Sequence, residues 1–419
     1  MKTLQVYLRI CFFALIIISL QMNYGCISNA QQYDLLLKGG TVVDPKNNIN
    51  NLSDVAILNG KIAKVALDIP ISTAKKVINV TGFYVVPGLI DAHTHVYGGL
   101  IRGAHADGEY SVFPDGYTLR TGVTTVVDAG SSGHRNFKHF HDGIIALSQT
   151  RVLAFLNIVG MGLSGSVHSQ NVVDMNPELA AKCAKDYPNH IVGFKTVQWQ
   201  GKEWINVDRA LEAGRLANLP VMCDFGRFYP VERPYQELVL KRLRPGDIST
   251  HMYKKDVPLF DENGTLLPYL IEARNRGVLF DLGHGLGNFE FSIVVPAVRQ
   301  GWWPNSLTTD LHAECVNHAS KDLNNLMSKM MNIGIPLVNI IEMVTWGPAK
   351  MIGRTDLGHL TLNAVADVAV LNLVKGNFGW LDVRNVRMTG TEKFQCELTL
   401  RDGKVVWDLN GIAAREELK

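Results

Sequence analysis

The chain has 419 residues, of which 47% are hydrophobic and 19% are charged, and its formal net charge is +2. This is the composition of an ordinary globular protein. It shows no clustering of basic residues of the kind that binds nucleic acid or an acidic membrane surface, so neither is expected as a partner.

The first thirty residues are typical of a secretory signal peptide. Lys2 and Arg9 give a short positive region, residues 10–20 are almost wholly apolar, and small residues precede a cleavage site after Ala30. The apolar run is shorter than the ~20 residues that span a bilayer, which argues against a membrane anchor. We therefore expect a periplasmic or secreted protein with no membrane span in its mature form. The alternative is a lipoprotein anchored through Cys26, although the residues before it fit a lipidation site poorly.

The cysteines that remain after cleavage do not form a disulfide framework or a cysteine zinc site, because they are widely spaced and contain no Cys-x-x-Cys pair. We expect most of them to be small buried hydrophobic residues. They are Cys183, Cys223, Cys315 and Cys396.

Both ends of the chain have the pattern of short strands. Near the start, Asn59-Gly60 lies between two apolar runs, and near the end Asp402-Gly403 does the same. Both dipeptides are strong hairpin signals. We therefore expect residues 31–86 and 361–419 to form one small β-sandwich domain around a different central domain.

The centre, residues 87–360, alternates between short apolar runs and stretches with helical spacing, such as residues 177–184 and 207–217. Repeated βα units of this kind predict a parallel sheet, and eight of them would close into a (β/α)₈ TIM barrel. The apolar runs are residues 84–90, 123–127, 152–158, 191–194, 220–223, 247–249, 278–282 and 306–309.

The first run delivers two histidines, His93 and His95, to the barrel mouth, where catalytic groups of this fold lie. Two histidines at positions i and i+2 of a strand point to the same side and can bind one metal ion. A second such pair, His139 and His141, lacks the preceding strand and is expected in a surface loop.

Lys195 ends the fourth run, and lysines are rarely buried without a partner. A side chain that reaches back to solvent is one interpretation. The other is a carboxylated lysine: burial and nearby cations lower the pKa of an amine, which can then react with CO₂ to give an anionic ligand that bridges two metal ions.

Each later run is also followed by a residue that can bind a metal or carry a proton. These residues are Asp224, His251, His284 and Asp310. Any one of them could be structural. Together they occur where a barrel needs them, so the sequence predicts a metal site.

Residues 86–95 resemble the signature of the amidohydrolase superfamily, and residues 38–45 and 366–371 resemble its split β-sandwich. Residues 192–195, 280–285 and 308–312 are similar to the deacetylase branch, near dihydroorotases and N-acyl amino acid deacylases. The resemblance covers almost all of the mature chain. It implies a hydrolase of C–N bonds other than peptide bonds.

The resemblance also implies roles for individual residues. His93, His95 and Asp310 would bind a first divalent ion, usually zinc, and carboxylated Lys195 would bridge to a second ion that His251 binds. A metal-bound water would lose a proton to become hydroxide. Asp310 would take that proton and pass it to the leaving nitrogen. His284 would be a second catalytic residue, which lies near the substrate and steadies it or the oxyanion.

Asp224 departs from the pattern, because the family usually has histidine at that position. Two divalent ions with the carbamate, Asp310 and a hydroxide have a total formal charge of +1. If Asp224 is also a ligand, the total formal charge of the site becomes zero. That change should weaken the Lewis acidity of the site, and an oxygen ligand makes Mn²⁺ or Fe²⁺ more plausible. Alternatively, Asp224 only binds a neighbouring side chain and the site holds one ion.

The substrate we expect is an N-acyl amino acid or a related small acylated carboxylate. Arg102, Arg227 and Arg233 follow strands one and five and could bind its carboxylate. An ester and a cyclic amide, as in dihydroorotases, are alternatives. A further alternative is a non-catalytic binding or assembly protein with the same fold. The metal ligands other than Asp224 are all present, however, which argues against it. The sequence leaves open whether the chain forms a homo-oligomer.

Overall fold

The structure is a computed structural model that describes residues 32–99, 110–164, 166–196 and 198–414. The predicted signal peptide with Cys26 and the candidate residue Arg102 lie outside the described residues.

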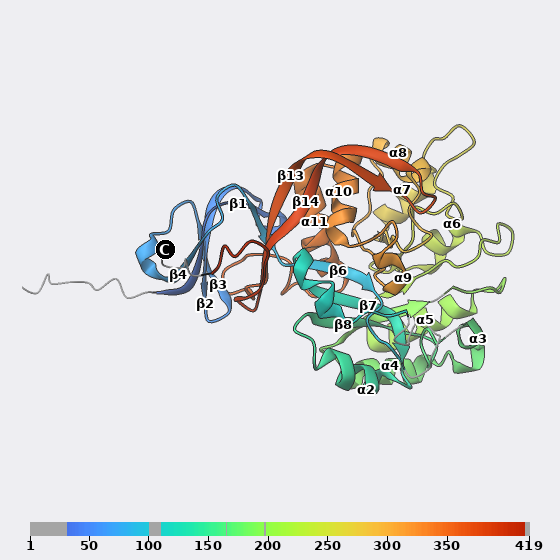
Figure 1. Ribbon diagram of the computed structural model, residues 1–419. Helices are drawn as coiled ribbons and strands as arrows, with labels where there is room; N and C mark the ends of the chain where they lie inside the picture. The colour runs from blue at the N-terminus through green and yellow to red at the C-terminus, as the bar shows by residue number, and fades with distance from the viewer. Residues whose placement is uncertain (1–31, 100–109, 165, 197, 415–419) are drawn as a thin grey trace, which may run out of the picture.

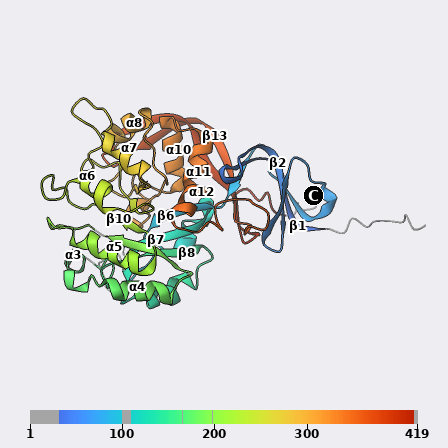
Figure 2. The same ribbon diagram turned by 180° about the vertical axis from the view of Figure 1, so that it is seen from behind.

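Figures 1 and 2 show a smaller body of β-strands beside a larger α/β body. The smaller body is built on a mixed sheet with the strand order β15-β14-β13-β5-β1-β2-β3, in which β4 also pairs with β1. Its strands come from both ends of the chain, as predicted. They are β1 (Tyr33–Asp44), β2 (Ile49–Leu58), β3 (Lys61–Ala66), β4 (Ala74–Asn79), β5 (Tyr84–Pro87), β13 (Val368–Leu381), β14 (Arg387–Arg401) and β15 (Lys404–Asp408).

Both predicted hairpins are confirmed. Asn59 and Gly60 join β2 to β3 with φ angles of 52° and 73°, and Asp402 and Gly403 join β14 to β15 with φ angles of 51° and 74°. Positive φ at both central residues is the requirement of the tight turn that matches the twist of two paired strands, and Asn-Gly and Asp-Gly meet it at low cost.

The larger body contains a curled parallel sheet with the order β12-β11-β10-β9-β8-β7-β6. Every strand corresponds to a predicted apolar run. The strands are β6 (Leu89–Thr94), β7 (Val123–Gly133), β8 (Arg151–Asn157), β9 (Ile191–Thr196), β10 (Val221–Cys223), β11 (Ile248–Ser249) and β12 (Leu279–Phe280).

The eighth predicted run, residues 306–309, is not assigned as a strand. The run nevertheless lies between the two edge strands of the sheet. Ser306 makes a parallel bridge with Asp281, directly after β12, and Leu311 makes one with Thr94 of β6. The chain turns into the left-handed region at Asp310, with φ of 53°, which breaks the regular pairing just where the strand should end.

The first predicted run, residues 84–90, is two strands rather than one. The chain leaves the mixed sheet after β5 and enters the barrel as β6, with Gly88 between them. A Cβ atom at Gly88 would lie 2.3 Å from Oγ1 of Thr124. The glycine thus permits the close approach by which the two bodies are joined.

Helices surround the barrel sheet (Figure 1). Those predicted at residues 177–184 and 207–217 are present as α4 and α5, and His139 lies on α2 rather than in a loop. The helices are α2 (Phe137–Phe140), α3 (Ser166–Ser169), α4 (Pro177–Asp186), α5 (Ile205–Ala217), α6 (Tyr235–Glu237), α7 (Pro268–Asn275), α8 (Phe291–Arg299), α9 (Ala313–Val316), α10 (Leu323–Ile333), α11 (Leu337–Val344) and α12 (Trp346–Met351).

The long strands β13 and β14 extend from the mixed sheet over the barrel helices, as the red ribbons of Figure 1 show. The backbone N–H of Phe394 in β14 donates to Oγ of Ser328 on α10 over 2.9 Å. Phe394 and Trp380 are buried in the same hydrophobic cluster as the barrel residues. One hydrophobic cluster therefore reaches from the barrel into the mixed sheet, and the mixed sheet has further clusters of its own.

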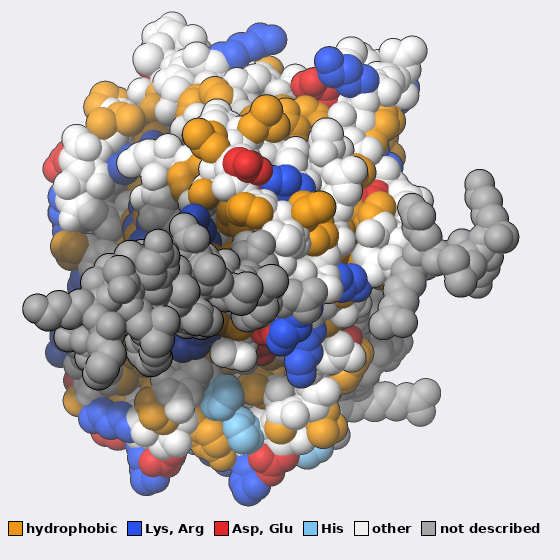
Figure 3. All heavy atoms as spheres, turned by 90° about the vertical axis from the view of Figure 1, so that its left-hand side faces the viewer, with side chains coloured by type: hydrophobic (Ala, Val, Ile, Leu, Met, Phe, Trp, Pro, Cys, Tyr) orange, Lys and Arg blue, Asp and Glu red, His pale blue; other side chains and the backbone are white. Residues whose placement is uncertain are grey.

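Cys183, Cys223, Cys315 and Cys396 are buried and free, as predicted. Within the described ranges, no helix has the length and apolar character needed to cross a membrane. On the face at the mixed-sheet end, basic and acidic side chains are interspersed, which agrees with the balanced composition (Figure 3).

Candidate metal centre

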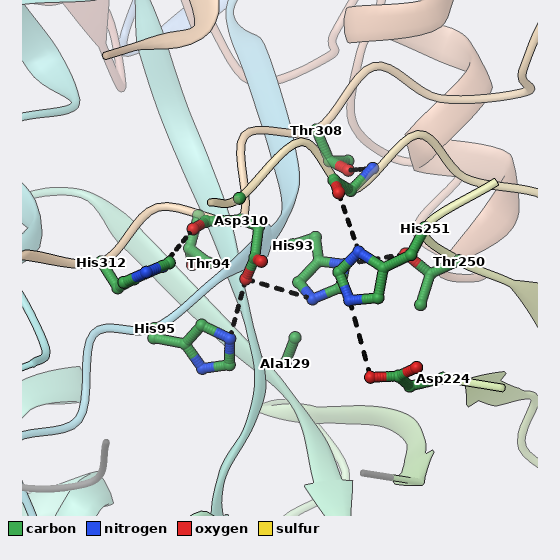
Figure 4. A network of polar contacts seen from close by, with 12 residues as sticks. His93, Thr94, His95, Ala129, Asp224, Thr250, His251, Thr308, Asp310 and His312 are labelled. Atoms are coloured by element: carbon green, nitrogen blue, oxygen red, sulfur yellow. Dashed lines mark hydrogen bonds and ion pairs between the residues drawn. The ribbon is translucent and has the colours of Figure 1, made fainter. Parts of the chain in front are cut away.

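The carboxyl ends of the barrel strands open into a cavity of about 460 Å³. All six residues predicted as metal ligands line it and are buried. They are His93, His95, Lys195, Asp224, His251 and Asp310. Figure 4 shows Asp310 between His95 and His93, with His251 between His93 and Asp224.

His93, His95 and Asp310 form one cluster whose candidate ligand atoms all lie within 4.8 Å of one another. Oδ1 of Asp310 is 2.9 Å from Nε2 of His95 and 3.5 Å from Nε2 of His93. On the other side of its ring, Nδ1 of His95 is 2.8 Å from Oγ of Ser131. Two imidazole nitrogens and a carboxylate oxygen converging on one point are a suitable ligand set for zinc.

Partners behind the cavity orient the other histidines. Nδ1 of His251 is 2.8 Å from the carbonyl oxygen of Gly283 and must donate to it, because a carbonyl only accepts. Nδ1 of His93 lies 3.2 Å from Oδ2 of Asp281. Hydrogen bonds of this kind fix the ring tautomer and leave Nε2 facing the cavity as a lone-pair donor, as metal-binding histidines require.

The environment also gives these groups the protonation states of metal ligands. Burial, aided by the nearby Lys195 ammonium, lowers the pKa of His93 to about 4, and burial lowers the pKa of His251. Burial by itself would raise the pKa of Asp310, but His93 and His95 outweigh it and hold the pKa well below its usual value. At neutral pH the imidazoles of His93 and His251 are therefore neutral, and the Asp310 carboxylate is ionised.

Asp224, His251 and Lys195 form a second group on the other side of His93. Oδ2 of Asp224 is 3.8 Å from Nε2 of His251. Lys195 is 3% exposed, and its Nζ lies 3.2 Å from Nε2 of His93. None of the carboxylates in the described ranges makes an ion pair with Lys195. A buried amine without a counter-ion, placed between two groups of ligands, fits carboxylation.

Backbone strain is concentrated at this centre. His251 and Asp310 adopt φ angles of 60° and 53°, in the left-handed region that costs a non-glycine residue energy. Gly283 and Gly285 lie against them: an added Cβ would be 2.5 Å from Nδ1 of His251 and 2.2 Å from Oδ2 of Asp310, respectively. The glycine-rich segment after β12 therefore makes room for two candidate ligands.

His284 was predicted near the substrate, but the structure places it behind the cavity. Its ring is fully buried and stacks on Phe289 at 4.6 Å. Nδ1 lies 2.9 Å from the carbonyl of Gly285, and Nε2 lies 2.9 Å from Nζ of Lys329. Both ring nitrogens are thus engaged inside the protein, and the ring does not line the cavity.

The structure gives Arg233 a different role from the carboxylate binding that we predicted. The residue is fully buried, and its guanidinium donates to the carbonyls of Phe225 over 2.8 Å and of Gly201 over 3.1 Å. Its plane also lies over the Trp204 ring, 4.9 Å from the centroid. Arg233 holds the loop after β10 together.

Arg227 is exposed and lines a hollow of about 470 Å³ that adjoins the cavity. The hollow and the cavity share Gln198, Gln200, Gly287 and Asn288. Other basic residues of the hollow are Lys254, Lys255 and Arg384.

His312 and Lys254 are two of the polar residues of the cavity wall and its rim that sequence reasoning missed. His312 lines the cavity, and its Nδ1 donates to the backbone carbonyl of Asp310 over 2.6 Å. Its position two residues after Asp310 was the available signal. Lys254 is 9% exposed, and its Nζ lies 3.5 Å from Oδ1 of Asp224. No sequence pattern marked that contact.

Several curated proteins resemble the chain. It is 32% identical to a deacetylase of Agrobacterium fabrum over 331 residues, which are 75% of this chain and 77% of the relative. It is 28% identical to a deacetylase of Enterococcus faecalis over 89% of this chain and 99% of the relative. A D-aminoacylase of Alcaligenes xylosoxydans is 28% identical over 54% of this chain and 45% of the relative.

Solved structures also resemble the chain. An adenine deaminase superposes with a TM-score of 0.80 at 27% identity, covering 90% of this chain and all of the other. A dihydroorotase superposes with a TM-score of 0.75 at 27% identity, covering 89% of this chain and 99% of the other. No protein-family model matches the chain.

Proposed function

Because the chain belongs to the deacetylases of the amidohydrolase superfamily, we propose that it deacylates an N-acyl amino acid or a related small acylated carboxylate. The observation that carries this proposal is the cavity itself. It brings a histidine–histidine–aspartate ligand cluster to one wall, and it adjoins a hollow lined by four basic and two acidic side chains. An acyl group at the ligands would leave an attached carboxylate within reach of that hollow.

We propose two divalent ions as cofactors, zinc first and Mn²⁺ or Fe²⁺ as alternatives. His93, His95 and Asp310 would hold one ion, and Asp224 and His251 the other, with carboxylated Lys195 between them. When bound, such ions supply Lewis acidity towards the acyl carbonyl and make a water molecule more acidic.

The protein's own groups then handle the substrate and the proton. Asp310 is ionised at neutral pH, so it can accept a proton from the attacking water and return it to the leaving nitrogen as the C–N bond breaks. Leu163 and Leu286 give the cavity apolar surface for the acyl group. The amide side chain of Asn288 can bind the polar atoms of the substrate amide.

In the adjoining hollow we assign the substrate carboxylate to Arg227. Its guanidinium is exposed and makes no ion pair with any carboxylate in the described ranges, so it is available to an anionic ligand. Replacing it with methionine should raise KM for acylated amino acids more than KM for the corresponding carboxamides. Equal effects on both would contradict this assignment.

The proposed function is tested with metal-replete protein and a panel of substrates. The panel contains N-acetyl amino acids of both configurations, O-acetyl hydroxy acids and dihydroorotate, and release of the amine, alcohol or ring-opened product is measured. Turnover of N-acetyl amino acids supports the proposal. Turnover of dihydroorotate alone would favour a cyclic-amide hydrolase, and metal binding without any turnover would favour a binding protein.

We also propose that the chain is exported and cleaved after Ala30, from the sequence pattern of residues 1–30. Mass spectrometry of the mature N-terminus from fractionated cells tests this. A chain that starts at Cys26 with an attached lipid would instead support the lipoprotein alternative.

A further inference from the structure

Lys254 makes a contact that the predicted site does not include. It lies three residues after His251, beyond the end of β11, and only 9% of it is exposed. Its Nζ is 3.5 Å from Oδ1 of Asp224 and makes an ion pair with it. The next residue, Lys255, is exposed and makes no ion pair with the described residues.

The two oxygens of Asp224 face different partners. Oδ1 accepts the backbone N–H of Gly226 over 2.9 Å and pairs with Lys254. Oδ2 faces Nε2 of His251 across the cavity. The carboxylate is therefore held by one oxygen, and the other is presented towards the place where a second ion would bind.

The charges of this pair have a simple consequence. The resemblance to the amidohydrolase superfamily implies a neutral histidine at the position of Asp224, and the aspartate by itself would add one negative charge to the site. The Lys254 ammonium adds one positive charge at short range. Asp224 and Lys254 together have the net charge of the histidine that they replace.

We infer that Lys254 is a positioning residue that makes Asp224 a working replacement for histidine: it orients the carboxylate and cancels its charge. This inference rests on the proposed function, because it concerns the second metal ion of that site. It explains why a lysine is buried next to a group of metal ligands, where its charge would otherwise repel the ion.

The inference predicts that histidine is tolerated at position 224 only when the lysine is removed. In Asp224→His, the ammonium of Lys254 would be left without its partner beside the ion, and we expect the affinity for the second Zn²⁺ to fall by about 10-fold to 100-fold. In the double variant Asp224→His/Lys254→Met, the net charge returns to that of the wild type. The affinity for the second Zn²⁺ should then recover to within a few-fold of the wild-type value.

The measurement is a Zn²⁺ titration of metal-free protein in competition with a chromophoric chelator, with circular dichroism to check the fold. The matched control is Asp224→His/Lys255→Met, which removes the neighbouring exposed lysine and should stay as weak as Asp224→His. The first Zn²⁺, at His93, His95 and Asp310, should keep its affinity throughout.

If the double variant binds the second Zn²⁺ no more tightly than Asp224→His, or if the Lys255 control recovers equally well, the role of Lys254 is refuted. A wild-type protein that binds only one Zn²⁺ would refute the two-ion site together with this role. Because the titration needs no substrate, its outcome is independent of which acylated compound the enzyme hydrolyses.

Discussion

Lys329 on α10 should make the stability of the protein depend on pH. The residue is fully buried, and its Nζ donates to the carbonyl of Ala319 over 2.6 Å. Burial, with a smaller contribution from Lys321, lowers its pKa from 10.5 to about 7. Between these two values the unfolded chain binds a proton that the folded protein does not bind.

The contribution of Lys329 to the free energy of unfolding therefore rises with pH in this window, by up to about 1.4 kcal/mol per pH unit. This increase in the free energy of unfolding is complete above the pKa of Lys329 in the unfolded chain, and it is lost as the pH falls towards 7. The Lys329→Met variant lacks this group, so the difference between wild type and variant should change by about 1.4 kcal/mol for each pH unit.

Urea unfolding followed by circular dichroism, at about pH 7, 8 and 9, measures this difference directly. Ionisable groups that do not contact Lys329 cancel because both proteins contain them. Lys393→Met is the control, since it removes a lysine from an exposed position of β14 rather than from a buried one. A constant difference for Lys329→Met would refute the proposed burial of a neutral lysine.

Three further substitutions test the centre. Asp310→Asn should lower kcat by about 100-fold to 10,000-fold with an unchanged circular dichroism spectrum, because the amide cannot carry the proton; near-normal turnover would exclude that role. Gly285→Ala should lower Zn²⁺ content through the clash with Asp310, whereas Gly287→Ala, with no atom within 4 Å, should retain it. Asp281→Ala should weaken Zn²⁺ binding by about 10-fold to 100-fold through the lost support of His93, measured by chelator competition.

The ligands at the strand ends could be predicted from the sequence because the barrel geometry is regular. A parallel strand that ends at the barrel mouth brings its last residues to the same place, whatever the helices between the strands do. His93 and His95 could be assigned from their spacing of two and from the apolar run before them. The turns at Asn59 and Asp402 could be assigned because their backbone conformation depends on two adjacent residues only.

Features that depend on irregular segments could not be predicted. Arg233 had the sequence context of an exposed loop residue, but the loop after β10 folds over it and satisfies its guanidinium with backbone carbonyls. His284 follows a strand end, yet the tight turn through Gly283 directs it behind the cavity. The contact between Lys254 and Asp224 joins two loops, and no periodicity relates residues that far apart in the chain.

The place of β5 in the mixed sheet has a consequence for synthesis of the chain. One edge of β5 pairs with β1, which is made early, but the other edge pairs with β13, which is made only after the whole barrel. Until then that edge is open, and open strand edges are templates for aggregation. We expect chains that stop before β13 to aggregate rather than to give a smaller soluble barrel. Synthesis of β13 thus determines when the open edge of β5 is covered.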